Sequence, residues 1–388
     1  MKKIIYTTLA MSTLLASCGK KEELAPNTST TTPALVVSTY DSTGYVAATT
    51  TQYAVRNALK KLVDEAKKGR ITGTGVNLGV LQSLYTSGST SLKTVTNTYY
   101  DSKIQDYLKN LSDASGTLYT PSATISGNGG VYGGYLFDEY GLEYEQLVEK
   151  GLFTAALYNH AISGLTGVVT TTTVHQIVAI SGLNTKFPNT DKTVGAPASG
   201  GGTHVGSTTP DVYMAAYGSR RDKSDGKGLY SQIKYNLTKA QAAANAGDKY
   251  KDTLSAALSA YKLSYEKISA ATVINYCIDS KAKFSKTSPS DADKASALHA
   301  YGEAVGFMTG WRGVSQEHKK ITDAQIDEIL TLLLAPISGN ASSYKFITEP
   351  AIYTPNLQTV QDKLKAIYGF SDAEMTDFAK NWVNEQKR

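Results

Sequence analysis

The segment 248–283 constrains the fold more than any other part of this chain, because it contains neither glycine nor proline. These two residues destabilise a helix interior most, so a stretch of this length without them favours continuous helix. Its apolar residues follow three- and four-residue steps and form one broad face: Leu254, Leu258, Tyr261, Leu263, Tyr265, Ile268, Val273, Ile274 and Cys277. This spacing predicts a central helix, or a pair of stacked helices.

The same helical spacing recurs in the first half of the chain. Segment 53–66 carries its apolar residues on one face and is followed by Gly69, a residue type that commonly ends helices. Segments 100–111 and 141–163 repeat the pattern. In the second half, helix-start signals predict three further helices, at Ser288 with Pro289, at Thr322 with Gln325 and at Ser371 with Glu374.

Two stretches, 116–134 and 166–228, are rich in glycine and threonine and are expected to form long irregular loops. Alternation of the kind that marks strands is convincing nowhere. The chain is therefore predicted to be all-α, with two packed helical bundles, 49–200 and 201–388, and long Gly/Thr-rich loops.

The composition excludes several classes of protein. With 388 residues, 41% of them hydrophobic, the chain can bury substantial cores and is not disordered as a whole. The formal charge of +5 is spread over 39 basic and 34 acidic residues, which argues against a nucleic-acid partner. Two cysteines and five histidines exclude a disulfide scaffold and a Cys/His zinc module. The 26 tyrosines suit helix interfaces, where the ring is buried and the hydroxyl is hydrogen-bonded.

The N-terminus has the pattern of a secretory signal. Lys2 and Lys3 precede an apolar stretch that is too short to span a bilayer. The stretch ends in Leu-Ala-Ser before Cys18, which resembles the lipobox of bacterial lipoproteins. That resemblance implies removal of residues 1–17, acylation of Cys18 and a tether over residues 18–48. The alternative is an ordinary cleavage site. Removal of Lys2 and Lys3 lowers the formal charge to about +3.

The residues after the cysteine add two short patterns. Lys21-Glu22-Glu23 resembles the signal that sends Bacteroidetes lipoproteins to the outer face of the outer membrane, although a solvated charged linker is the alternative. Asp41-Ser42-Thr43 and Asp252-Thr253-Leu254 resemble the O-glycosylation sequon of the same bacteria, which implies Ser42 and Thr253 as acceptors.

Several motifs, in the same order, resemble one family of Bacteroidetes cell-envelope lipoproteins of unknown function that is imelysin-like. They are Tyr144 to Leu152, Tyr265 to Ala271 leading to Tyr276, His299, Glu303 to Phe307 and Ile321 to Asp327. The resemblance covers roughly residues 50–385. It implies a helical envelope protein linked to iron or haem uptake, and some imelysins were first described as peptidases.

The chain also departs from that family. Where a histidine-rich acidic segment is expected, residues 173–180 keep one histidine, His175, and no acid. The Gly-x-His-x-x-Glu motif of imelysin is absent. These differences weaken any metal or catalytic role that depends on either motif.

His299 and Glu303 stand four residues apart, on one face of a predicted helix. An imidazole and a carboxylate at this spacing can share a divalent metal, with Glu143, Glu145 and Glu149 as the candidate further ligands. The alternative is that Glu303 accepts a hydrogen bond from His299 and only fixes packing. Cys277 falls on an apolar face and is interpreted as a small buried hydrophobic residue.

The sequence therefore predicts an outer-membrane lipoprotein that faces the exterior and is anchored through Cys18. Its predicted role is non-enzymatic, in binding or as an accessory protein, and the family resemblance implies iron or haem uptake. A divalent metal or haem is the candidate cofactor, and an outer-membrane transporter or envelope complex is the candidate partner. Two alternatives stay open: a metal-dependent imelysin-like hydrolase with no catalytic residue identified, and a structural subunit of an envelope complex.

Overall fold

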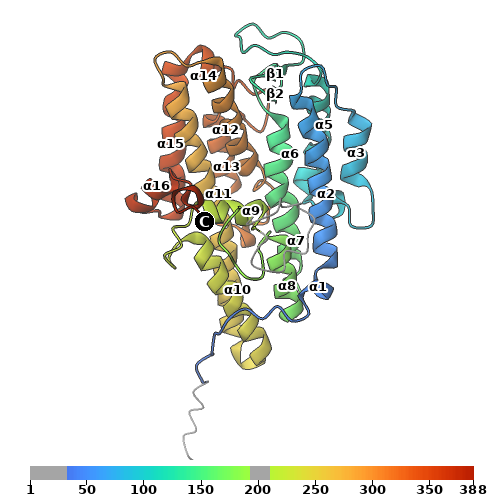
Figure 1. Cartoon of the computed structure of the whole chain (residues 1–388), viewed down its shortest axis with the longest axis vertical. Helices are drawn as coiled ribbons and strands as arrows, with labels where there is room; N and C mark the ends of the chain where they lie inside the picture. The colour runs from blue at the N-terminus through green and yellow to red at the C-terminus, as the bar shows by residue number, and fades with distance from the viewer. Residues whose placement is uncertain (1–32, 193–209) are drawn as a thin grey trace, which may run out of the picture. The chain divides into compact units, whose positions relative to one another are not determined.

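A single helix of 34 residues, α11 (Lys251–Phe284), lies at the centre of the fold (Figure 1). It packs against α10 (Leu229–Ala246), α12 (Asp291–Thr309) and α15 (Pro350–Tyr368). The predicted apolar face is buried, except that Leu254 is half-buried and Leu263 is exposed. One long helix, and not a stacked pair, therefore forms the central element.

The structure, a computed structural model, describes residues 33–192 and 210–388. Residues Leu35–Arg388 form one compact unit. The signal segment, Cys18, Lys21-Glu22-Glu23 and the expected division near residue 200 lie outside the described residues. The described part is helical apart from one hairpin, so the all-α prediction is confirmed.

The first half of the chain supplies helices on the other side of α12 (Figure 1). Its main helices form where the apolar spacing predicts them. The set comprises α1 (Tyr45–Ala48), α2 (Thr50–Lys67), 3-10 turn η1 (Lys68–Arg70), α3 (Leu78–Thr86), α4 (Leu92–Val95), α5 (Thr98–Ala114), α6 (Tyr144–Leu152), α7 (Asn159–Ser163) and α8 (Thr171–Ile180). The apolar residues of α2 and α6 that face α12 and the core are buried.

The second half continues with shorter elements around α11. These are α9 (Tyr213–Arg220), η3 (Asp248–Tyr250), η4 (Gln316–His318), α13 (Asp323–Leu332), α14 (Lys345–Thr348), α16 (Asp372–Phe378) and α17 (Trp382–Glu385). Both predicted capping boxes, at Thr322 and Ser371, are present with their side chains bonded as expected. The start predicted at Ser288 is wrong, because Ser290 is the N-cap of α12 and forms a capping box with Asp293.

Helices α6 and α12 join the two halves of the fold, and glycine allows their close contact. A Cβ on Gly306 would lie 2.3 Å from the carbonyl oxygen of Gln146, and one on Gly310 would lie 2.6 Å from that of Gly151. No larger side chain fits without separating the two backbones. This approach brings polar residues of α6 opposite those of α12.

Helix α6 does not continue regularly into α7. A π-helical turn, η2 (Phe153–Tyr158), lies between them. Two of its carbonyl groups accept hydrogen bonds from outside the turn: the Tyr265 hydroxyl donates to Phe153 O (2.9 Å) and the Asn97 amide donates to Ala155 O (2.8 Å). These external donors satisfy carbonyl groups in the turn, and such turns often occur at functional sites.

The expectation that the chain contains no strands was wrong. Strands β1 (Gly130–Tyr132) and β2 (Tyr135–Phe137) pair antiparallel around the turn Gly133-Gly134. Both glycines have positive φ, which a two-residue hairpin turn requires. Strands of three residues are too short to show alternation, so the Gly-Gly pair is the local signal that indicates the hairpin.

The stretch 166–228 is also more regular than predicted, because it contains α8 and α9. Thr170 caps α8 through a capping box with Thr173, and Val174, Ile177 and Val178 are buried at helical spacing. Contacts with α2 and α10 stabilise this threonine-rich helix. The tertiary contacts outweigh the modest helix propensity of threonine.

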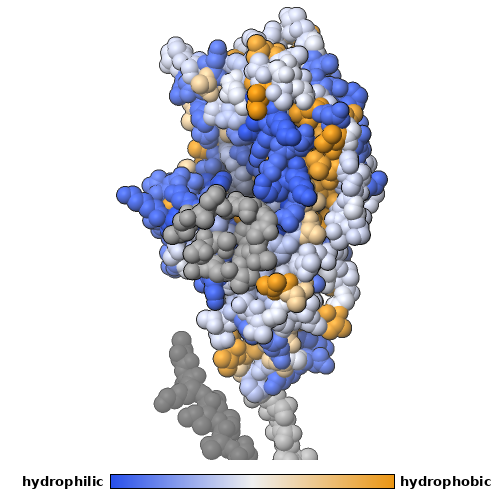
Figure 2. All heavy atoms as spheres, turned by 45° about the vertical axis from the view of Figure 1, so that its right-hand side comes forward, coloured by the Kyte–Doolittle hydropathy of each residue, from blue (hydrophilic) through white to orange (hydrophobic). Residues whose placement is uncertain are grey.

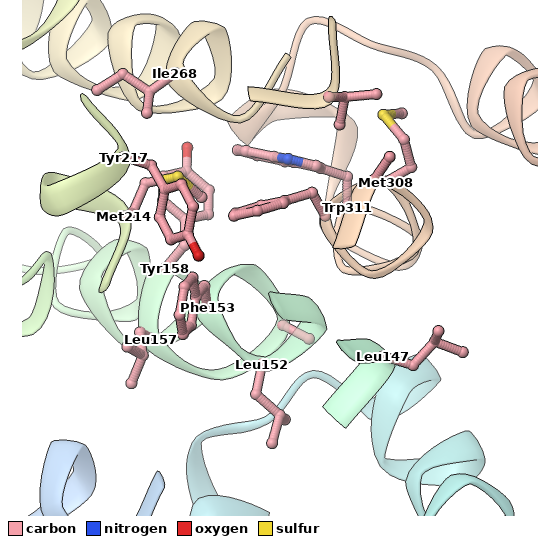
Figure 3. Packing of buried hydrophobic residues seen from close by; sticks show 14 of the residues in the cluster. Leu147, Leu152, Phe153, Leu157, Tyr158, Met214, Tyr217, Ile268, Met308 and Trp311 are labelled. Atoms are coloured by element: carbon pink, nitrogen blue, oxygen red, sulfur yellow. The ribbon is translucent and has the colours of Figure 1, made fainter. Parts of the chain in front are cut away.

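Aromatic residues fill the centre of the core (Figure 3). Tyr158 lies beside Trp311, with ring centroids 5.0 Å apart, and the Trp311 indole donates to Ser269 Oγ (3.0 Å). The hydroxyl of Tyr158 donates to His318 O, and that of Tyr100 donates to Leu147 O. These two buried tyrosines satisfy their hydroxyls with backbone carbonyls, in keeping with the role that the composition predicts for tyrosine.

Hydrophilic residues cover much of the face in Figure 2, with hydrophobic residues between them. Within residues 33–192 and 210–388, no helix has the length and apolar character needed to span a membrane.

Candidate functional site

The residues proposed from sequence as metal ligands meet between α6 and α12. Glu143 precedes α6, Glu145 and Glu149 belong to it, and His299 and Glu303 lie on α12. Glu143 and Glu145 are at most 1% exposed, and Glu303 is 7% exposed. Because buried carboxylates require partners, the cations around them decide what this cluster can do.

At one end of the cluster, Arg70 of η1 binds two carboxylates. Its guanidinium donates to Glu143 Oε1 (3.0 Å) and to both oxygens of Glu145. The second oxygen of Glu143 accepts a hydrogen bond from His299 Nδ1 (2.7 Å). The Tyr135 ring stacks on the imidazole with centroids 4.2 Å apart, and Arg70 also lies over that ring.

At the other end, Lys150 of α6 joins the remaining acids. Its ammonium is 3.0 Å from Glu149 Oε2 and 3.1 Å from Glu303 Oε1. Lys67 of α2 lies 3.2 Å from the same oxygen of Glu149, and Tyr217 of α9 donates to Glu303 Oε1 (3.3 Å). We refer to Lys67, Arg70, Glu143, Glu145, Glu149, Lys150, His299 and Glu303 as the ionic network.

Burial and neighbouring charges shift the pKa values within the network. Burial, with the Glu143 carboxylate nearby, raises the pKa of Glu145 to about 7 despite Arg70. Burial alone would raise the pKa of Glu149, but Lys150 and Lys67 outweigh it and lower the value to about 2. Burial opposes charge on His299, yet the bonded Glu143 carboxylate raises its pKa above the ordinary value.

The cations in the network take the role of counter-ions to its carboxylates. Among the residues that the structure describes, no group of three or more His, Cys, Asp or Glu side chains is arranged to hold a metal ion. Metal binding by these five residues stays a prediction. The predicted alternative, a hydrogen bond between His299 and Glu303 within α12, does not form. Instead, His299 donates to Glu143, and Glu303 pairs with Lys150.

A cavity of about 330 Å³ lies against the Lys150 end of the network, and we call it the network cavity. Three of its wall residues, Lys67, Glu149 and Tyr217, belong to the network or bond to it. Further lining residues are Lys60, Val63, Asp64, Phe153, Asp191, Pro210, Asp211, Val212, Tyr213, Ala216 and Arg220. Its wall therefore combines aromatic rings with charges of both signs.

Two unusual backbone features lie at this cavity. Phe153 begins the π-helical turn, and Tyr213 has φ 51°, a left-handed conformation that costs a tyrosine roughly 1–3 kcal/mol. The Tyr213 hydroxyl donates to Arg56 O (2.8 Å), and its ring packs edge-to-face on Phe153. These contacts hold both rings in the wall; Figure 3 shows Phe153 directed towards Tyr217.

The other sequence candidates lie elsewhere. His175 on α8 bonds to the Tyr40 hydroxyl and to Thr43 O, near the N-terminal end of the described chain. Cys277 is 1% exposed, and burial raises the pKa of its thiol, as the interpretation of a core residue requires. Ser42 is half-buried beside α1, and Thr253 lies in the first turn of α11.

Sequence reasoning missed the cations of the network and the wall of the cavity. Lys67 and Arg70 are more than 70 residues from the acids that they bind, and Arg220 and Tyr213 lie in a stretch expected to be irregular. Only the proximity of Lys150 to Glu149 in sequence could have indicated part of the network.

Comparison of the chain with protein-family models, with curated proteins and with solved structures finds no match.

Proposed function

We propose that this protein is a lipid-anchored protein of the cell envelope that binds a small zwitterionic ligand in the network cavity. The observation that carries the binding role is a cavity of about 330 Å³ whose wall includes mutually paired, partly exposed charges. This volume falls at the lower end of the range of roughly 300–1,000 Å³ that is typical of small-molecule sites.

The wall of the cavity favours a ligand that carries both charges. Lys67 and Arg220 can bind a carboxylate, and Asp191, which pairs with Arg220 at 2.5 Å, can bind an amine. The rings of Phe153 and Tyr213 offer apolar surface between these groups. An amino acid or short peptide with an aromatic side chain would satisfy all three parts of the wall.

The protonation states support binding rather than catalysis. Glu149 lines the cavity, but its pKa near 2 makes it a poor general acid or base at neutral pH. Glu145 has a pKa near 7, which suits proton transfer, but it is held by Arg70 and does not line the cavity. Asp211 also lines the cavity and has a pKa of about 7, but its carboxylate oxygens are occupied by the backbone amides of Asn184 and Thr190.

Calorimetric titration of the full chain in mild detergent tests the binding role. We expect phenylalanine to bind, and phenethylamine and phenylacetate, which each carry one charge, to bind at least about tenfold more weakly. Arg220→Gln should weaken phenylalanine binding, whereas Lys61→Gln, an exposed change on α2 outside the cavity, should not. Equal binding of the three compounds, or no binding of any, would contradict the proposal.

The anchoring part of the proposal rests on the Leu-Ala-Ser-Cys18 pattern and on the tether that follows it. Protease treatment of intact cells should degrade the protein if it faces the exterior, and full protection would refute the surface location. A transporter or envelope partner should co-purify after mild detergent extraction, and repeated recovery of the protein alone would count against such docking.

The iron or haem link stays a prediction from the family resemblance. Titration with haem, followed by its absorption spectrum, and metal analysis of the purified protein test it directly. Stoichiometric metal that is lost in His299→Ala would favour the hydrolase alternative over the binding role.

A further inference from the structure

A second cavity, of about 450 Å³, lies apart from the network and is formed partly by the start of the described chain. Val37 and Ser38 line one side of it, and residues of α10 line another. We call residues 35–44 the strap and this space the strap cavity. Its remaining wall comes from the loops around residues 187–189 and 224–226.

The strap is held on the body by paired hydrogen bonds. The Tyr40 hydroxyl bonds to His175 Nδ1 (2.5 Å), and His175 Nε2 bonds to Thr43 O (3.0 Å). Because a carbonyl only accepts, Nε2 carries the hydrogen and Nδ1 accepts from Tyr40. The Gln241 amide exchanges two bonds with the backbone of Asp41, at 2.8 and 2.7 Å. These contacts fix Val37 and Ser38 as a wall.

Strained backbone is concentrated at the strap cavity. Phe187, Asn189 and Ser224 all line it, and all have left-handed φ values of 48–59°. Such conformations cost of order 1–3 kcal/mol each for residues other than glycine, and they persist where the surrounding structure holds them. The side chain of Phe187 is thereby held in the cavity wall.

The Asn189 side chain is held in one orientation in this wall. Its Nδ2 donates to Asp222 Oδ1 (3.3 Å), and because a carboxylate only accepts, this bond fixes the orientation of the amide. The opposite atom, Oδ1, is buried and accepts no hydrogen bond. Asn189 is 6% exposed and this oxygen is itself buried, so the residue shapes the wall and offers no acceptor to a ligand.

The chemistry of the wall selects the ligand class. Uncharged polar side chains are contributed by Ser38, Asn189, Ser224, Ser231 and Thr238, and Tyr230, Tyr235 and Phe187 provide ring surface. No carboxylate lines the cavity, and its one cationic lining residue, Lys234, makes no ion pair within the described residues. A purely aromatic acid would make no use of the hydroxyl groups in this wall.

We propose that the strap cavity binds a saccharide unit that carries a carboxylate. The sugar ring would lie on the face of the Tyr235 ring that Lys239 does not cover. Its hydroxyls would bond to the hydroxyl side chains of the wall, and its carboxylate would face Lys234. The strap forms part of this site, so a segment that the sequence predicts to be part of the tether takes part in recognition.

Calorimetric titration of the full chain in mild detergent with methyl β-D-glucuronide tests this proposal, with methyl β-D-glucoside and phenylacetate as comparisons. We expect the glucuronide to bind with a Kd of about 1 mM, the glucoside about fivefold more weakly, and phenylacetate more weakly still. Ser38→Trp, an exposed change on the strap, should fill the cavity and abolish binding.

Two further variants separate this site from the network cavity. Lys234→Gln should weaken glucuronide binding about fivefold and leave glucoside binding unchanged, because only the carboxylate loses a partner. Arg220→Gln, in the other cavity, should leave glucuronide binding unchanged. Stronger binding of phenylacetate than of the glucuronide would overturn the saccharide assignment. No binding of either glycoside, or full binding by Ser38→Trp, would overturn the site itself.

Discussion

Lys150 shows how one side chain can determine the character of a whole site. It is 4% exposed, and its ammonium bonds to Glu149 and Glu303, which come from different helices. Burial opposes its charge, but the two carboxylates raise its pKa well above the ordinary value. The residue therefore stays charged and holds α6 and α12 together through paired, desolvated ions.

Replacement of Lys150 by methionine should lower the free energy of unfolding by about 3–5 kcal/mol, because the buried Glu303 carboxylate loses its cation and Glu149 keeps only Lys67. Lys109→Met is the matched control: Lys109 pairs with Asp113 on the surface of α5, and its loss should cost less than about 1 kcal/mol. Denaturant unfolding of both variants measures the difference. Similar, small losses would show that the network contributes little to stability.

The local sequence predicts the start of α12 two residues too early. The Ser288-Pro289 pair has the chemistry of a helix start, yet the side chain of Ser290 accepts the bond from Asp293 N. A capping box with Asp293 decides the start, since it satisfies two backbone donors at once.

The N-cap of α12 should contribute measurably to the stability of the protein. Ser290→Ala should lower the free energy of unfolding by about 1 kcal/mol, because α12 loses its N-cap acceptor. Ser288→Ala should change it by less than about 0.5 kcal/mol, as expected for a surface substitution away from such features. Thermal unfolding compares the two variants, and an equal effect would contradict the assigned helix start.

The contact between α6 and α12 gives a second prediction for elements. Gly306→Ala places a methyl group against the Gln146 carbonyl and should destabilise the protein by about 1–3 kcal/mol. At Gly302 an added Cβ would lie 3.2 Å from Glu143 Cβ, and alanine gains helix propensity there, so Gly302→Ala should cost much less. Chemical denaturation ranks the variants; the reverse order would be inconsistent with the observed packing.

At the scale of the whole molecule, several buried acids titrate together. Burial raises the pKa of Asp138, Asp211 and Glu145 to about 7 each, and the pKa of His299 is raised as well. All four groups therefore bind protons more strongly in the folded chain than in the unfolded chain between about pH 5 and 7.

The sign of the pH dependence follows from this difference. Stability from these groups is fully present below their unfolded pKa values and is lost as the pH rises through about 7. Between pH 5 and 8 we expect each of the three acids to contribute a fall of about 2–3 kcal/mol in the free energy of unfolding, since one pKa unit corresponds to about 1.4 kcal/mol. Asp211→Asn should reduce the fall, and an unfolding free energy that rises over this range would refute the prediction.

Membrane attachment is the other property of the whole molecule that can be tested simply. Cys18→Ser should move the protein from the membrane fraction to the soluble fraction, because it removes the predicted acylation site. Cys277→Ser changes the other cysteine, which is buried in α11, and should leave the protein with the membrane. Unchanged partition of Cys18→Ser would contradict lipid anchoring.

The sequence alone determined the longer helices of regular apolar spacing and the charges that the fold would have to accommodate. Apolar spacing along 248–283 and the caps at Thr322 and Ser371 are local signals, and each predicts an element that forms. The same local reasoning placed His299 and Glu303 on one helix face. Period and capping are properties of neighbouring residues, so they can be read without knowing the fold.

Only the tertiary structure decided how those charges are used. Arg70 reaches Glu143 and Glu145 across more than 70 residues, and Tyr213 enters the cavity wall from a segment that has no clear local pattern. The backbone approach at Gly306 brings α6 to α12 and thereby places Lys150 beside Glu303. Burial then sets the pKa values, because the cost of a desolvated charge depends on which partners the fold brings near it.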